Sequence, residues 1–265
     1  LSFNGGELLP VHQSGATYRI PLSSVVSTLE YPTSDSRYVK TFAELQSANS
    51  DTSVTRIILG ADITISSTIT IADTKVVFFQ KYKFVKSGSA TIRFLGSVQA
   101  GRYQIFSGYS AGNITGPFKN SEIYPEWWGM TTNRAELAIN SAISAVDYYN
   151  QGNTVSLAAG TYYTGGPIDL RGSLTQLVGA GSGATTIYTT SAWAPSRWLT
   201  SYYYFSGGAY SGANYNCRSG AILIGGDIVS GHSFRTGIRG ITINCYEATK
   251  NNPTKKVCGI TTSDY

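Results

Sequence analysis

Hydrophobic residues follow a helical period in one stretch of the chain. Between positions 135 and 146 they recur three and four residues apart, as on one face of an amphipathic helix. Asn133 is the predicted N-cap, with Glu136 three residues later as in a capping box. The pattern therefore predicts a helix whose apolar residues are Ala135, Leu137, Ala138, Ile139, Ala142, Ile143 and Val146.

After position 150 the hydrophobic period changes to two. Val155 and Leu157 alternate with polar neighbours, and short apolar bursts follow, separated by glycine and proline. One helix followed by many short strands with small-residue corners is typical of the start of a parallel β-solenoid. The helix would cover the open end of the hydrophobic interior, where unpaired strand edges would otherwise be exposed.

An earlier part of the chain repeats this order. A short helix is expected to begin near Thr41, and the strand-like segments TRIILGA, ITISSTITI and TKVVFF follow it. This order predicts a small β-solenoid unit ahead of the main one; chance similarity between two β-rich segments is the alternative. Its alternating apolar residues are expected to face the interior: Ile63, Ile65, Ile69, Ile71, Val77 and Phe79, then Ile92, Phe94, Val98, Tyr103, Ile105 and Phe106.

Four motifs carry a family resemblance. They are PEWWG at 125–129, the alanine-rich helix, V-x-L-x-x-G-x-Y from Val155, and L-V-G-x-G-S-G-A-T-x-I from Leu177. Together with the preceding KSGSATIRFLGSVQAGRYQIFSG, they resemble the beginning of the right-handed parallel β-helix in the pectate-lyase-like superfamily. The version carried by bacteriophage tailspikes and capsule depolymerases is the most similar. The resemblance covers about residues 84–265, and it specifies fold better than reaction.

The resemblance implies an all-β protein built around a right-handed parallel β-helix with an N-terminal capping helix. We expect a virion-anchoring segment and connector at 1–40, a small β-rich unit with a short helix at 41–123, and the start of the β-helix at 124–265. The last strand-like segment ends without the polar cap that a solenoid needs. The chain is therefore expected to be the N-terminal part of a longer protein.

The expected function is that of a phage tailspike, located on the virion tail and acting extracellularly at the host surface. Residues 1–40 would bind phage tail or adaptor proteins, with a flexible linker as the alternative for this segment. The β-helix would bind and depolymerise host surface polysaccharide. A low charge and many aromatic residues favour a homotrimer of β-helices packed side by side. The alternatives are a non-enzymatic tail fibre or adhesin that only binds glycans, and a secreted bacterial polysaccharide lyase or hydrolase.

Charge and composition indicate which partners are not expected. The net charge of +5 is spread along the chain, and its densest basic run, Lys81, Lys83, Lys86 and Arg93, alternates with apolar residues. This alternation favours a solvated strand face over a nucleic-acid surface. No apolar run reaches membrane-spanning length, so no membrane insertion is expected. The three cysteines form no CxxC pair and are expected to be buried free thiols.

Catalytic constellations are scarce in this sequence. Two histidines give no convincing Ser-His-Asp triad, and neither metal-ligand spacing nor a cofactor motif is present. The glycines at 179–183 resemble a dinucleotide fingerprint, but the strand-like TTIY that follows indicates a solenoid corner. The weak catalytic candidates are Asp227, Glu247 and Asp264, because acids on neighbouring rungs can approach the separation found in glycosidases. We expect the active site itself to lie beyond Tyr265.

Aromatic residues leave two interpretations open. Trp127 and Trp128 could stack on sugar rings, but packing beneath the predicted helix is favoured because it buries a large apolar area. The aromatic-rich stretch 191–219 could bind sugars, contact a neighbouring chain, or pack on itself.

Overall fold

The computed structural model describes residues 8–13, 16–21, 35–131, 133–147, 153–170, 175–192, 217–225, 237–245 and 256–263. For the strands at 8–13, 16–21 and 256–263, and for most of 217–225, the description covers the backbone only. None of the helices in these ranges is long and apolar enough to cross a membrane. β1 (Leu8–Gln13) and β2 (Ala16–Pro21) pair as an antiparallel hairpin.

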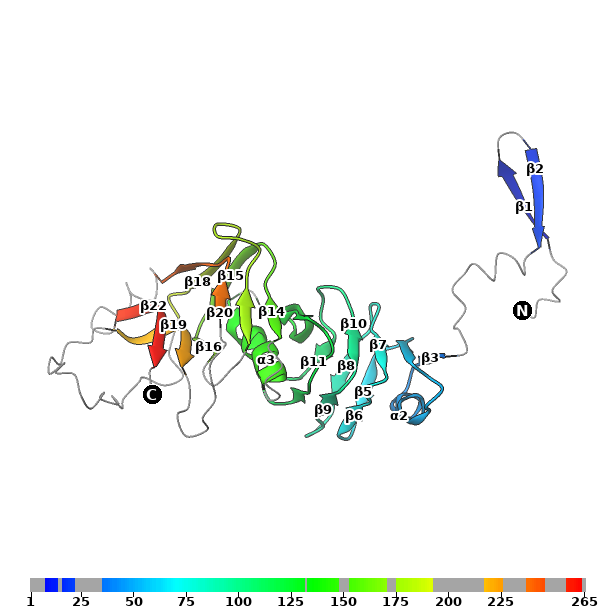
Figure 1. Ribbon diagram of the computed structural model, residues 1–265, viewed down its shortest axis with the longest axis horizontal. Coiled ribbons are helices and arrows are strands. Elements are labelled where there is room, and N and C mark those ends of the chain that lie inside the picture. The colour runs from blue at the N-terminus through cyan, green and yellow to red at the C-terminus, as the bar shows by residue number, and fades with distance from the viewer. Residues whose placement is uncertain are drawn as a thin grey trace.

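Successive turns of the chain build three parallel sheets, which together we call the first stack (Figure 1). The first sheet contains β3 (Ser36–Val39), β4 (Arg56–Leu59), β7 (Val76–Phe78) and β10 (Ser97–Gln99). The second contains β5 (Ile63–Ile65), β8 (Phe84–Lys86) and β11 (Phe106–Ser107). The third contains β6 (Ile69–Ile71), β9 (Ile92–Phe94) and β12 (Ile114–Thr115). Each turn thus adds one strand to each sheet.

Three further parallel sheets form the second stack in the same way. They contain β13 (Glu122–Ile123), β14 (Thr154–Ser156), β17 (Gln176–Val178) and β20 (Gly237–Arg239); β15 (Gly160–Thr164), β18 (Thr185–Thr189) and β21 (Thr242–Asn244); and β16 (Ile168–Asp169), β19 (Cys217–Gly225) and β22 (Lys256–Ser263). The predicted strand-rich fold with few helices is confirmed. The sheets are not closed, and the right-handed β-helix stays a prediction.

Alternation of side chains fills the interior of the first stack. All the apolar residues predicted to face inward are buried except Tyr103, which is partly exposed. Phenylalanine rings form much of this interior: Phe79 contacts Phe84 edge-on at a centroid distance of 4.8 Å, and Phe94 stacks on Phe118 at 5.0 Å. The buried residues of both stacks belong to one hydrophobic cluster that runs from Val39 to Ile222.

Helix α3 (Ala135–Asp147) joins the two stacks. It contacts β12 and the 3-10 helix η1 (Pro125–Trp128) on one side, and β14, β15 and β16 on the other. Figure 1 shows the helix in the middle of the molecule, between β11 and β16. The helix was expected to cover the end of the second stack; it also lies against the first, which explains why the hydrophobic cluster is continuous.

Two polar residues of α3 attach it to opposite stacks. The Ser144 hydroxyl accepts a hydrogen bond from the Gly112 amide at 3.0 Å, in the first stack. The Asn140 side chain donates to the Pro167 carbonyl at 3.0 Å and accepts from the Asp169 amide at 2.9 Å, in the second stack. The helix therefore bonds to both stacks through side chains as well as through apolar packing.

The prediction that Leu137 belongs to the buried helix face is wrong. Its side chain is 52% exposed, whereas Ala135, Ala138, Ile139, Ala142, Ile143 and Val146 are buried. Leu137 lies three residues before Asn140 and seven before Ser144, on the side of the helix that carries its polar residues. Glu136 is buried and accepts hydrogen bonds from the Gly165 amide and from Arg134.

Helix α2 (Phe42–Ser50) begins near Thr41, as predicted, with a complete capping box. The Glu44 amide donates to the Thr41 hydroxyl at 3.2 Å, and the Glu44 carboxylate accepts from the Thr41 amide at 3.1 Å and from the Lys40 amide at 2.6 Å. The hydrogen bond from Lys40 is the largest cause that lowers the pKa of Glu44. The cap thus satisfies backbone donors that a helix start would otherwise leave unpaired.

A buried lysine fixes the corner that follows α2. Lys75 is 2% exposed, and its ammonium group donates to the carbonyls of Asp51 and Val54. These carbonyls lie just after the C-terminal end of the helix, where a cation is favoured. The alkyl stem of Lys75 is buried with the ammonium group, so the residue both packs and satisfies polar backbone atoms.

Lys75→Met should lower the free energy of unfolding by about 2–3 kcal/mol, because it keeps the buried stem but removes the charged donor of two carbonyls. The Asp51 carbonyl would keep its hydrogen bond from the Val54 amide. The matched control is Lys81→Met, since Lys81 is exposed, and that change should stay within about 0.5 kcal/mol. Urea unfolding followed by circular dichroism measures both. Equal midpoints for the two variants would show that the Lys75 ammonium contributes nothing to stability.

Candidate functional site

The strand ladder is interrupted where the two stacks meet. β10 is the last strand of its sheet in the first stack, and β13 is the first of its sheet in the second. Between them the Asn120 side chain accepts a hydrogen bond from the Val98 amide at 2.8 Å and donates to the Val98 carbonyl at 2.7 Å. One side-chain amide thus takes the place of a neighbouring strand. We call this junction the seam.

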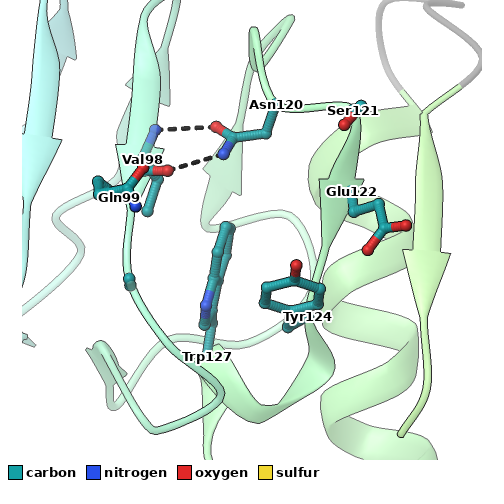
Figure 2. Close-up of a pocket in the computed structure, with 8 residues that line it drawn as sticks. Val98, Gln99, Asn120, Ser121, Glu122, Tyr124 and Trp127 are labelled. Atoms are coloured by element: carbon teal, nitrogen blue, oxygen red, sulfur yellow. Dashed lines mark hydrogen bonds between the residues drawn. The ribbon is translucent and has the colours of Figure 1, made fainter.

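A pocket with a volume of about 180 Å³ opens at the seam (Figure 2). Tyr124 and Trp127 stand beside one another in it, with ring centroids 5.4 Å apart and planes at 74°. Glu122 supplies the only charged side chain among the lining residues. The full lining consists of Val98, Gln99, Ala100, Asn120, Ser121, Glu122, Tyr124 and Trp127.

Arg102 holds Tyr124 and the start of the second stack together. Its guanidinium carbon lies 4.1 Å from the centroid of the Tyr124 ring. The same group donates to the Glu126 carboxylate at 3.2 Å, to the Ser156 carbonyl at 3.0 Å and to the Ser156 hydroxyl at 2.9 Å. The positive charge of Arg102 is therefore paired with Glu126 and hydrogen-bonded within the protein.

The two tryptophans pack beneath the helix, which confirms the favoured interpretation. Trp127 and Trp128 are both buried. The Trp128 ring lies 5.0 Å from that of Phe106, and the Trp127 indole N–H donates to the Gly101 carbonyl at 3.0 Å. Trp127 borders the seam pocket but has 1% of its surface exposed, so it supports the pocket wall and offers no open stacking face.

The electrostatics of the pocket keep Tyr124 protonated. Burial is the main cause that raises the pKa of the Tyr124 hydroxyl, and the neighbouring Glu122 carboxylate raises it further. Because the shift is upward from an already high ordinary value, the hydroxyl is neutral at physiological pH. The pocket thus combines one acidic group with hydroxyl and amide groups.

A second aromatic surface lies on the outer face of the sheet formed by β15, β18 and β21. Tyr163 pairs in register with Tyr188, and Tyr188 with Asn244. The two tyrosine rings are 5.4 Å apart, edge to face, and Tyr163 is 39% exposed. Thr161, Thr186 and Thr242 form a parallel row beside them. This face therefore presents aromatic rings and hydroxyl groups on successive strands, separated by the distance between neighbouring strands of a sheet.

The catalytic candidates Asp227, Glu247 and Asp264 lie outside the described residues, as does most of the aromatic-rich stretch 191–219. Within the described ranges, no group of three or more His, Cys, Asp or Glu side chains is placed to hold a metal ion. The Cys245 thiol is partly buried, and burial raises its pKa.

Two further interpretations from the sequence can be compared with the structure. The segment 179–184 forms a corner, with positive φ at Gly181 and Gly183, and strand β18 follows instead of a helix. The dinucleotide fingerprint is therefore absent from this segment. In the basic run, Lys86 donates to the Asn113 side chain at 2.8 Å and Lys81 lies 5.5 Å from the Tyr82 ring, so both cations contact side chains of this chain.

Residues 36–157 match the family model described as "Putative pectate lyase-like adhesive domain". This match supports the pectate-lyase-like superfamily. It covers the whole first stack, the seam, α3 and the first strand pair of the second stack. It does not single out tailspikes or capsule depolymerases. Comparisons with curated proteins and with solved structures give no match.

Sequence reasoning missed most of the seam. Asn120 and Glu122 belong to no motif, and Arg102 lies in the segment before PEWWG without a role that the sequence indicates. Each of the three has its role only because strands distant in sequence meet there. Tyr124 precedes the PEWWG motif, which indicated packing and not a pocket. The one usable signal was that an aromatic cluster stands directly before a helix.

Proposed function

We propose that this chain is a polysaccharide-binding module, adhesive in function, on a pectate-lyase-like scaffold. The observation that carries the proposal is the match of residues 36–157 to a family described as adhesive. All the residues that line the seam pocket, together with Arg102 and Ser156, fall within the matched range. Binding is thus proposed for the part of the chain that the match covers.

The chemistry of the two surfaces supports glycan binding. Sugars present many hydroxyl groups and apolar ring faces, and protein sites for them combine hydrogen-bonding side chains with aromatic rings. The seam offers Gln99, Ser121, Glu122 and Tyr124, and the outer face offers the Tyr163–Tyr188 pair. Both surfaces arise from strands that are stacked in register, so their side chains are held at fixed positions.

The finer proposal is a phage tailspike, and it rests on the resemblance of the PEWWG region and the motifs after it. In this proposal residues 1–40 attach the protein to the virion tail, the protein is a homotrimer, and the sheets belong to a right-handed β-helix, the hand that about 98% of parallel crossovers adopt. The protein would act extracellularly at the host surface. In this proposal the depolymerase active site lies outside the described residues.

The proposal is tested on a panel of immobilised bacterial capsule and O-antigen polysaccharides. We expect the chain to be retained on at least one of them and released by the same polysaccharide in solution. Retention should be reduced by Tyr163→Ala or by Tyr124→Ala, since these residues carry the two aromatic surfaces. Passage of the folded chain through every column without retention would refute the glycan-binding function.

A further inference from the structure

The seam pocket is a small cavity bounded by residues from both stacks. β10 supplies Val98 and Gln99, whereas β13 supplies Glu122 and η1 supplies Trp127. Its volume of about 180 Å³ is below that of sites for drug-sized ligands and suits a single ring. The pocket exists because the Asn120 side chain, and not a full strand, continues the ladder from β10.

Polar groups dominate the walls of the pocket. Figure 2 shows the Glu122 carboxylate and the Tyr124 hydroxyl at one side of the opening, and Gln99 and Asn120 at the other. The Asn120 amide is already bonded to Val98, so the groups that remain for a ligand come from Gln99, Ser121, Glu122 and Tyr124. A polyhydroxylated ring can both donate to and accept from such a set.

The charges around the pocket favour a neutral ligand. Glu122 is the only charged lining residue, and a carboxylate accepts hydrogen bonds from sugar hydroxyls. Arg102 is the cation beside Tyr124, but its donors bind Glu126 and Ser156 and its face covers the Tyr124 ring. An anionic sugar would meet Glu122 without a free cation among the lining residues, and like charges at short range repel.

We propose that the seam pocket binds one uncharged sugar residue of a polysaccharide, through Glu122 and Tyr124, and that Glu122 discriminates against uronic acids. This inference rests on the proposed glycan-binding function. It adds the position of one subsite and the charge class of the sugar that occupies it.

The test uses saturation-transfer NMR and affinity titration of the whole chain. The probes are neutral glucose-, galactose- and mannose-based oligosaccharides and, as the acidic counterpart, oligogalacturonate. We expect at least one neutral probe to bind more tightly than oligogalacturonate. Glu122→Ala should weaken its binding about tenfold, the loss expected for hydrogen bonds to a charged group. Glu122→Gln should raise the affinity for oligogalacturonate, because the repelling charge is removed while hydrogen-bonding capacity remains.

Asp73→Asn is the matched control, since Asp73 is an exposed acid outside the pocket, and it should leave both affinities unchanged. Circular dichroism of each variant establishes that the fold is intact. A neutral probe whose affinity is the same for the wild type and Glu122→Ala would overturn the subsite and leave the glycan-binding function standing. Tighter binding of oligogalacturonate by the wild type would overturn it as well. Binding of no probe, together with no retention on the polysaccharide panel, would refute both the sugar subsite and the glycan-binding function.

Discussion

Trp127→Ala is expected to lower the free energy of unfolding by about 3–5 kcal/mol, the cost usual for truncating a buried aromatic residue. Trp127 lies where the first stack, η1 and α3 meet, and its ring contacts those of Phe106, Tyr124 and Trp128. The truncation also removes the donor of the Gly101 carbonyl. Because the hydrophobic cluster is continuous through this point, the loss should destabilise both stacks together.

Chemical unfolding followed by tryptophan fluorescence and circular dichroism measures this effect. Tyr163→Ala is the aromatic control, since Tyr163 lies on the outer face of its sheet, and it should cost less than about 1 kcal/mol. Trp127→Phe should fall between the two, because it keeps much of the packing and loses the hydrogen bond. If Trp127→Ala lowered the free energy of unfolding no more than Tyr163→Ala, the region around Trp127 would not be part of the stabilising core.

Gly96→Ala should be the more damaging of two glycine substitutions in the first stack. A Cβ atom at Gly96 would lie 2.2 Å from the Lys75 carbonyl oxygen and 2.6 Å from that of Ala72. Both are backbone atoms of the neighbouring turn, and the Lys75 carbonyl accepts the Ser97 amide in the ladder. The clash can be relieved only by separating the two turns, so we expect a loss of about 3 kcal/mol or more.

Gly60→Ala provides the comparison for this prediction. A Cβ atom there would lie 3.2 and 3.3 Å from carbons of the Lys40 side chain, and a flexible lysine can move away. Its nearest backbone neighbour would be the Val39 carbonyl oxygen at 3.7 Å, an ordinary van der Waals contact. Thermal and urea unfolding of the two variants should therefore give clearly different midpoints. Equal midpoints would contradict the close backbone approach of the two turns at Gly96.

The strands and their inward-facing residues could be predicted because a period of two is a local property. Ile63, Ile65, Ile69 and Ile71 alternate with threonine and serine, and all four are buried. The start of helix α2 near Thr41 could also be predicted, since the residues of its capping box lie within one turn of each other. Such features depend on neighbours in sequence, which the sequence displays directly.

Other features depend on contacts between distant turns and could not be predicted in this way. The sequence around Lys75 indicates an exposed side chain, as is usual for lysine. It is buried because the corner after α2 lies one turn beneath it. Helical spacing indicates a core position for Leu137, yet its side chain is 52% exposed, because spacing alone does not show which helix positions the two stacks cover. The Asn120 side chain replaces a strand only because β10 and β13 end and begin on either side of it.

The central claim is that this chain binds polysaccharide, and size-exclusion chromatography with light scattering tests it most directly. The chain is mixed with each soluble polysaccharide of the panel, and the elution position of the protein and the molar mass of the polysaccharide are recorded together. The account predicts that the protein co-elutes with at least one polysaccharide whose molar mass stays unchanged. Elution of the folded protein apart from every polysaccharide would contradict it.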